Sequence, residues 1–71
     1  MAKYVVNKNA QSDGYHEVHN EETCNHLPEP HNRVSVGNYN SCSSAVAACK
    51  NENTSFKIDG CYYCSNACHT R

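Results

Sequence analysis

The sequence predicts a small α+β domain, in which a short antiparallel sheet of three or four strands packs against one main helix at about residues 41–51. Three observations lead to this fold class. Two short strand-like runs flank a turn signal near the N-terminus, one later stretch has helical periodicity, and the last residues are rich in cysteine. A chain of 71 residues has room for one domain, so residues 1–71 are treated as a single unit.

The N-terminal part is expected to form a β-hairpin. Residues 3–8 have the alternation of a strand, and residues 9–14 are a polar run that ends in Asp-Gly, a strong turn signal. Residues 15–19 return as a second strand. Because side chains alternate along a strand, we expect His16 and His19 to lie on opposite faces.

The middle of the chain carries weaker signals. Residues 20–33 are polar and contain two prolines, which argue against a long helix and leave room for one helical turn over residues 21–27. Residues 33–36 are expected to form a short third strand that ends at Gly37-Asn38.

The clearest element is the helix at about residues 41–51. Its expected N-cap is Ser41 or Asn40. Four small apolar side chains fall at i, i+3, i+4 and i+7, which places them on one stripe facing the core: Cys42, Ala45, Val46 and Cys49. After a connector, residues 56–58 are expected to form a brief strand that leads into Asp59-Gly60.

Composition indicates that the core needs a covalent or metal staple. Leu, Ile, Val and Phe together number nine, about 13% of the chain, which is below the roughly 20% under which disorder has to be considered. Net charge is only −1, so the high charge of disordered chains is missing. The chain also has six cysteines and five histidines, more than packing requires.

Compartment decides between a metal and disulfides. The N-terminus lacks the apolar run of a signal peptide, and no stretch reaches transmembrane length, so we expect a cytoplasmic protein without membrane contact. Thiols stay reduced in that compartment, which favours a metal, most simply zinc, over disulfides or free thiols. A mature fragment of a secreted precursor would reverse that preference.

The strongest ligand signal is the Cys61-x-x-Cys64 pair, a C-terminal metal knuckle preceded by Gly60. Two intervening residues let both sulfurs reach one tetrahedral ion at about 2.3 Å. Cys24 is the next candidate, because a distant cysteine can clip two parts of a domain together.

The fourth ligand stays open. Cys68 is one candidate, with His69 as its substitute or as a hydrogen-bonding partner of the site; His16 or His19 is the other. Of the remaining cysteines, Cys49 is expected to pack as a small hydrophobic residue. Cys42 lies at the helix start, where the helix dipole favours a reactive thiolate.

These motifs occur in an order that is familiar from one known domain: Tyr15-His16, Cys24, residues 33–36, the Ala-rich residues 44–48, then Cys61 and Cys64. This order resembles the small zinc-binding domain at the N-terminus of the Ada DNA-repair protein. The resemblance implies a small α+β fold and a tetrahedral zinc with Cys24, Cys61 and Cys64 at ligand positions. The second family cysteine is replaced by Pro28, and the basic DNA-facing surface is missing, which argues against methyl transfer to a zinc-bound thiolate.

A fuller string also resembles a group of uncharacterised microbial proteins of about this length, and it covers nearly the whole chain. It consists of His16-x-x-His19, Cys24, Leu27-Pro28, Asn32-Arg33, Gly37, Cys42, Ala45-Val46 and Asp59-Gly60-Cys61-x-x-Cys64-x-x-x-Cys68-His69. This second resemblance implies no function.

The sequence therefore predicts a zinc-binding structural or interaction module that is not an enzyme, because a closed four-ligand site has no open position for a substrate. Its ligands are expected to be Cys24, Cys61 and Cys64 with Cys68 or His16. One alternative is a thiol-redox or metal-handling protein that uses the surplus cysteines. A second is an Ada-like nucleic-acid-binding module, which the scattered Lys and Arg residues disfavour. The sequence names no protein partner, although it leaves room for one.

Overall fold

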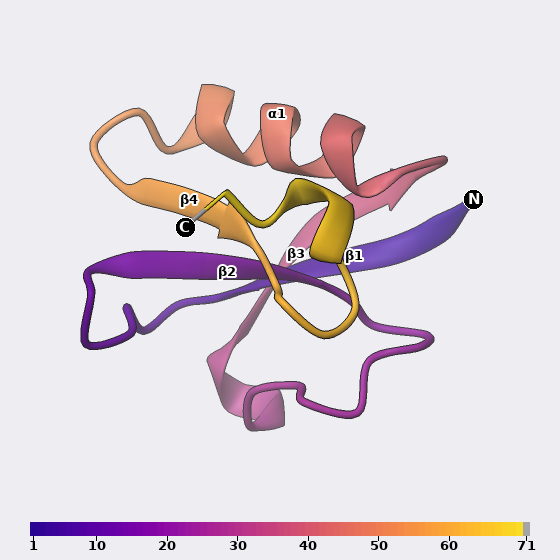
Figure 1. Cartoon of the computed structure of the whole chain (residues 1–71), viewed down its shortest axis with the longest axis horizontal. Coiled ribbons are helices and arrows are strands. Elements are labelled where there is room, and N and C mark those ends of the chain that lie inside the picture. Colours follow the sequence, from indigo (N-terminus) through magenta and orange to yellow (C-terminus); the bar gives the residue numbers. More distant parts are fainter. Residues whose placement is uncertain (71) are drawn as a thin grey trace.

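The computed structural model describes residues 1–70 as a four-stranded sheet with one α-helix across one face (Figure 1). The small α+β class and the single α-helix are confirmed for this described part of the chain. In chain order the elements are β1 (Ala2–Asn7), β2 (Tyr15–Asn20), the 3-10 turn η1 (Pro30–Asn32), β3 (Arg33–Tyr39), α1 (Cys42–Glu52), β4 (Lys57–Gly60) and the 3-10 turn η2 (Asn66–Cys68).

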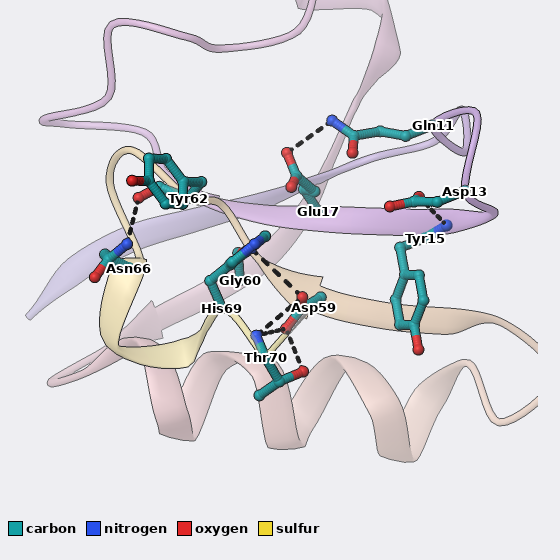
Figure 2. Close-up of polar contacts among 10 residues, drawn as sticks. All are labelled: Gln11, Asp13, Tyr15, Glu17, Asp59, Gly60, Tyr62, Asn66, His69 and Thr70. Atoms are coloured by element: carbon teal, nitrogen blue, oxygen red, sulfur yellow. Dashed lines mark hydrogen bonds and ion pairs between the residues drawn. The ribbon is translucent and has the colours of Figure 1, made fainter.

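The hairpin expected at the N-terminus is present. Strands β1 and β2 pair antiparallel, with Val6 opposite Val18. In the turn between them, the Asp13 carboxylate accepts a hydrogen bond of 3.0 Å from the backbone N–H of Tyr15 (Figure 2). Gly14 has φ +88°, a left-handed conformation that glycine adopts without steric cost. Asp13 and Gly14 therefore form the turn, through the side-chain hydrogen bond of one and the left-handed backbone of the other.

The expectation of a purely antiparallel sheet is wrong for the last strand. The strand order is β3-β1-β2-β4, and β4 pairs with β2 in parallel. The cause is α1, which connects β3 at one edge of the sheet to β4 at the other edge. The helix also returns the chain to the end of the sheet at which β3 begins, so β4 starts from that same end. A strand that follows such a crossover runs in the same direction as the strand before it.

Strand β3 is longer than expected, because Gly37 does not end it. The register against β1 shifts between Tyr4 and Val5, so Tyr4 lies opposite Gly37 while Val5 lies opposite Ser35. This irregularity is a β-bulge, and Gly37 takes φ +130° within it. A glycine inside a strand pattern thus bends the strand here and does not terminate it.

The core lies between the sheet and α1. The Ser41 side chain caps the helix by accepting from the backbone N–H of Ser44 at 3.4 Å. The buried helix face meets side chains from β1, β2 and β4, and the core consists of Tyr4, Val6, Val18, Ala45, Val46, Cys49 and Ile58. Cys49 is 2% exposed, which confirms its packing role. A core this small stabilises the fold only modestly, since each buried Val or Ile contributes about 1.5–3 kcal/mol.

A disulfide joins Cys42, the first residue of α1, to Cys68 in η2. This bond is a correction, because Cys68 is expected as a metal ligand and Cys42 as a reactive thiolate. It closes a loop with a sequence separation of 26 and ties the C-terminal segment to the helix. The four cysteines outside this bond, Cys24, Cys49, Cys61 and Cys64, are free thiols.

No helix within residues 1–70 combines the length and the apolar character that crossing a bilayer requires.

Replacing Cys42 with serine is expected to lower the free energy of unfolding by about 3 kcal/mol, because the open chain regains the entropy that the closed loop removes. Urea denaturation with a phosphine reductant present or absent measures the effect. Cys68→Ser is the matched control and should give the same loss. If the reductant still destabilises either variant, the stabilisation does not come from this bond.

Candidate metal centre

Four side chains meet on the face of the sheet that lies away from α1. His19 comes from β2, Cys24 from the turn after it, Cys61 from the end of β4 and Cys64 from the following loop, and their ligand atoms all lie within 4.8 Å of one another. Two widely separated chain segments are brought together because β2 and β4 are neighbours in the sheet. Three of the cysteines expected at the site, Cys24, Cys61 and Cys64, are thus gathered with one histidine.

The distances in this cluster fit a tetrahedral ion. The Cys24 sulfur lies 3.5 Å from His19 Nδ1 and 4.0 Å from the Cys61 sulfur, and the Cys64 sulfur lies 3.9 Å from His19 Nδ1. Around a tetrahedral zinc with ordinary bond lengths, two sulfurs are separated by about 3.8 Å and a sulfur and a nitrogen by about 3.6 Å. These three distances are close to those of such a site, and all four ligand atoms lie within 4.8 Å of one another.

His19 is directed to the cluster by strand alternation. Its neighbour Val18 packs in the core against α1, so residue 19 must face the other way, opposite Val5 of β1. His19 is only 4% exposed. Burial lowers the pKa of His19 to about 4, and the nearby charges of Arg33 and His26 act in the same direction. The imidazole is therefore neutral near pH 7, the form that binds metals.

A single turn at the end of β2 positions Cys24. The backbone N–H groups of Thr23 and Cys24 both donate to the Asn20 carbonyl, at 3.3 and 3.0 Å. The backbone N–H of His26 points back and donates to the Cys24 sulfur at 3.4 Å. The expected helical turn after the second strand is thus a tight turn, and it aims the sulfur at the sheet.

Gly60 allows the Cys61–Cys64 loop to lie close to η2. A Cβ at position 60 would be 2.7 Å from the Cys68 Cβ and 2.8 Å from the Ser65 carbonyl oxygen, distances that real Cβ atoms do not show. The sequence suggests a turn as the reason for this glycine, whereas the structure shows a close approach of two backbone segments. The loop then closes through the Ser65 N–H, which donates to the Cys61 carbonyl at 2.9 Å.

The chain beyond the loop is held by a buried carboxylate. Asp59, 2% exposed, accepts from the Thr70 hydroxyl at 3.1 Å and from the Thr70 backbone N–H at 3.1 and 3.2 Å (Figure 2). His69 Nδ1 donates to the Gly60 carbonyl at 3.0 Å. The Asn66 amide donates to the Tyr62 carbonyl at 3.1 Å. His69, the expected substitute ligand, therefore anchors the tail and stays outside the cluster.

Thiol protonation at the site follows from burial. Burial raises the pKa of the Cys61 thiol, and burial together with a hydrogen bond to Cys24 raises the pKa of Cys64 to about 12. Without a cation the Cys61 and Cys64 thiols therefore stay protonated near pH 7. A divalent ion binds only after displacing the thiol protons, so metal and protons compete for the same sulfurs.

Two residues expected as ligands lie elsewhere. His16 faces the α1 side of the sheet, where its Nδ1 donates to the Asn7 carbonyl at 3.0 Å and its ring packs 4.9 Å from that of Phe56. Cys68 is bonded to Cys42 and packs against the core. The choice of His19 over His16 was available from the sequence. Val18 completes the apolar face with Tyr4 and Val6, so residue 19 had to be on the other face.

Comparisons with known proteins give no match, whether by protein-family models, by curated proteins or by solved structures. The interpretation of the centre therefore depends on its own geometry.

Gly60→Ala is expected to weaken metal binding and to lower stability by about 1–3 kcal/mol, because the added methyl group meets the Cys68 Cβ and two backbone atoms, none of which is the movable end of a side chain. Gly14→Ala is the comparison variant. It strains a left-handed turn with a Lys57 side-chain carbon as its nearest neighbour, at 4.0 Å, so it should cost stability while zinc affinity stays unchanged. Equal zinc affinity in both variants would contradict the close-packing role of Gly60.

Zinc affinity is expected to fall at least about 100-fold per pH unit on acidification below neutral, because Cys61 and Cys64 each release a proton when the ion binds. Competition with a chromophoric chelator over a range of pH measures this slope, and calorimetry in buffers of different ionisation enthalpy counts the protons. Cys64→Ser should release about one proton fewer, whereas His16→Gln should behave as wild type. A pH-independent affinity would overturn the assignment of the thiols as ligands.

Proposed function

We propose that this chain is a zinc-binding structural and interaction module with a Cys₃His centre formed by His19, Cys24, Cys61 and Cys64. The observation that carries the proposal is the convergence of these four ligand atoms within 4.8 Å. Three thiolates and one imidazole are a soft donor set that favours zinc over magnesium or calcium. In this ligand set His19 takes the place expected for His16 or Cys68.

The role proposed for the ion is structural. It joins the end of β2 to the end of β4, and the sequence between these ligands contains β3 and α1. A link across so much chain stabilises the fold strongly, since the binding energy of a structural zinc contributes directly to folding. With four protein ligands no coordination position is left for a substrate, and this supports a role outside catalysis.

The interaction role is supported by two exposed aromatic side chains in the zinc loop. Tyr62 and Tyr63 are 56% and 65% exposed, and they lie between the ligands Cys61 and Cys64. Their rings contact each other edge to face at 5.3 Å. Tyrosine is enriched at protein interfaces, because it offers a large and rigid contact area at low entropic cost. We propose this pair as the surface that meets a protein partner.

A metal-handling function is the second candidate. It is favoured by the coexistence of one disulfide and three cluster thiols in the same chain, which shows that its cysteines occupy two chemical states. The resemblance to the Ada domain stays a prediction, and so does nucleic-acid binding. The cytoplasmic location also stays a prediction, because disulfides are commoner in oxidising compartments.

Elemental analysis of protein purified without chelator tests the proposal, together with intact mass under non-reducing, denaturing conditions. We expect one zinc per chain and one disulfide. Replacing any ligand, as in His19→Asn, Cys24→Ser, Cys61→Ser or Cys64→Ser, should lower zinc affinity by more than about tenfold. Cys49→Ala and His16→Gln are the controls and should keep full stoichiometry. Absence of zinc, with two or more disulfides in the mass, would overturn the proposal.

A further inference from the structure

The four proposed ligands are unequally shielded from solvent. Cys61 is 1% exposed, His19 4% and Cys24 8%, whereas Cys64 is only partly buried. The sheet seals the centre on one side, and the side that carries Cys64 is open.

A hollow of about 450 Å³ lies against this open side. Two of the proposed ligands form part of its wall, and its lining consists of Thr23, Cys24, Asn25, His26, Tyr63 and Cys64. At its rim the His26 and Tyr63 rings stack, with centroids 3.7 Å apart and planes at 20°. Both residues are exposed, so this stacked pair borders the hollow on its solvent side.

The position of Cys64 in the fold also distinguishes it from the other two sulfur ligands. Cys61 continues the sheet, since its N–H donates to the Val18 carbonyl at 2.9 Å. The Cys24 sulfur accepts from the His26 N–H at 3.4 Å. Cys64 lies in the loop after β4, outside the strands, where its sulfur contacts the Asn20 backbone and, at 4.0 Å, the Ser65 hydroxyl. Cys64 is therefore the ligand that combines a loop position with partial exposure to solvent.

We propose that the metal is exchanged through this hollow, where the thiolate of a low-molecular-weight thiol enters and replaces Cys64 as a ligand. This inference rests on the zinc site proposed above and assigns it a metal-donating activity. One metal–sulfur bond forms to the incoming thiolate, and the bond to Cys64 breaks. The proton lost by the incoming thiol is taken up by Cys64 through solvent. No atom is oxidised or reduced, so no further reagent is needed.

The stacked pair His26 and Tyr63 narrows the way in and thereby sets the rate. Its two rings lie on the same segments as Cys24 and Cys64, and all four residues line the hollow. Removing either ring should widen the hollow without touching the ligands. The exchange should then become faster, while the affinity for zinc changes little.

Zinc transfer from the loaded full-length chain to a bulky chromophoric chelator tests this inference, with free cysteine added at increasing concentration. We expect the transfer rate to rise linearly with cysteine, and free serine at equal concentration to have no effect. His26→Ala and Tyr63→Ala should raise the cysteine-dependent rate several-fold. Phe56→Ala is the control, because it removes an aromatic ring that is 55% exposed on the other side of the sheet, and it should leave the cysteine-dependent rate unchanged.

Two results separate failure of this inference from failure of the proposed function. A chain that binds no zinc overturns both. A chain that binds one zinc but releases it at a rate independent of cysteine, or unchanged in the two rim variants, overturns only the exchange route. Mapping of maleimide labelling on the zinc-loaded chain adds a second readout: Cys64 should be labelled several-fold faster than Cys24 and Cys61, and equal labelling would contradict the assignment of Cys64 as the ligand that leaves.

Discussion

The parallel pairing of β2 with β4 is the contact on which the rest of this structure depends. It places Val18 beside Gly60, and so the C-terminal ends of the two strands and the residues after them lie at the same end of the sheet. His19 and Cys24 come from one segment, Cys61 and Cys64 from the other. The pairing is possible only because α1 carries the chain across the sheet, so the helix positions the centre without contributing a ligand.

The domain has a cross-link on each side of its sheet. On the α1 side the Cys42–Cys68 disulfide ties the helix start to η2. On the other side the Cys₃His cluster joins β2 to the loop after β4. The chain between Cys61 and Cys68 passes from one face to the other around the end of β4. With so few large aliphatic residues in the core, these two cross-links replace buried area that longer chains obtain from packing.

Local signals in the sequence were sufficient for local features. The Asp13-Gly14 turn, the Ser41 cap and the helix stripe through Cys49 follow from propensities and periodicity, and all three are present. Pairing between distant strands leaves no such local trace. The direction of β4, the bulge at Gly37 and the bond from Cys42 to Cys68 all depend on contacts between segments that are far apart in the sequence. The choice of His19 as a ligand depends on both kinds of information. It requires a residue type that binds metal, and it requires the knowledge that Val18 faces the core, so that residue 19 faces the other side of the sheet.

The contacts of residues 69 and 70 affect how the edge of the sheet can pair with another copy of this chain. Strand β4 is at the edge of the sheet, and an unpaired edge strand is a template for adding the strand of another copy. His69 donates to the Gly60 carbonyl and Thr70 donates to the Asp59 side chain, so residues 69 and 70 lie beside the end of β4 and take up one of its backbone acceptors. A strand of another copy that paired with this end of β4 would first have to displace the His69 contact.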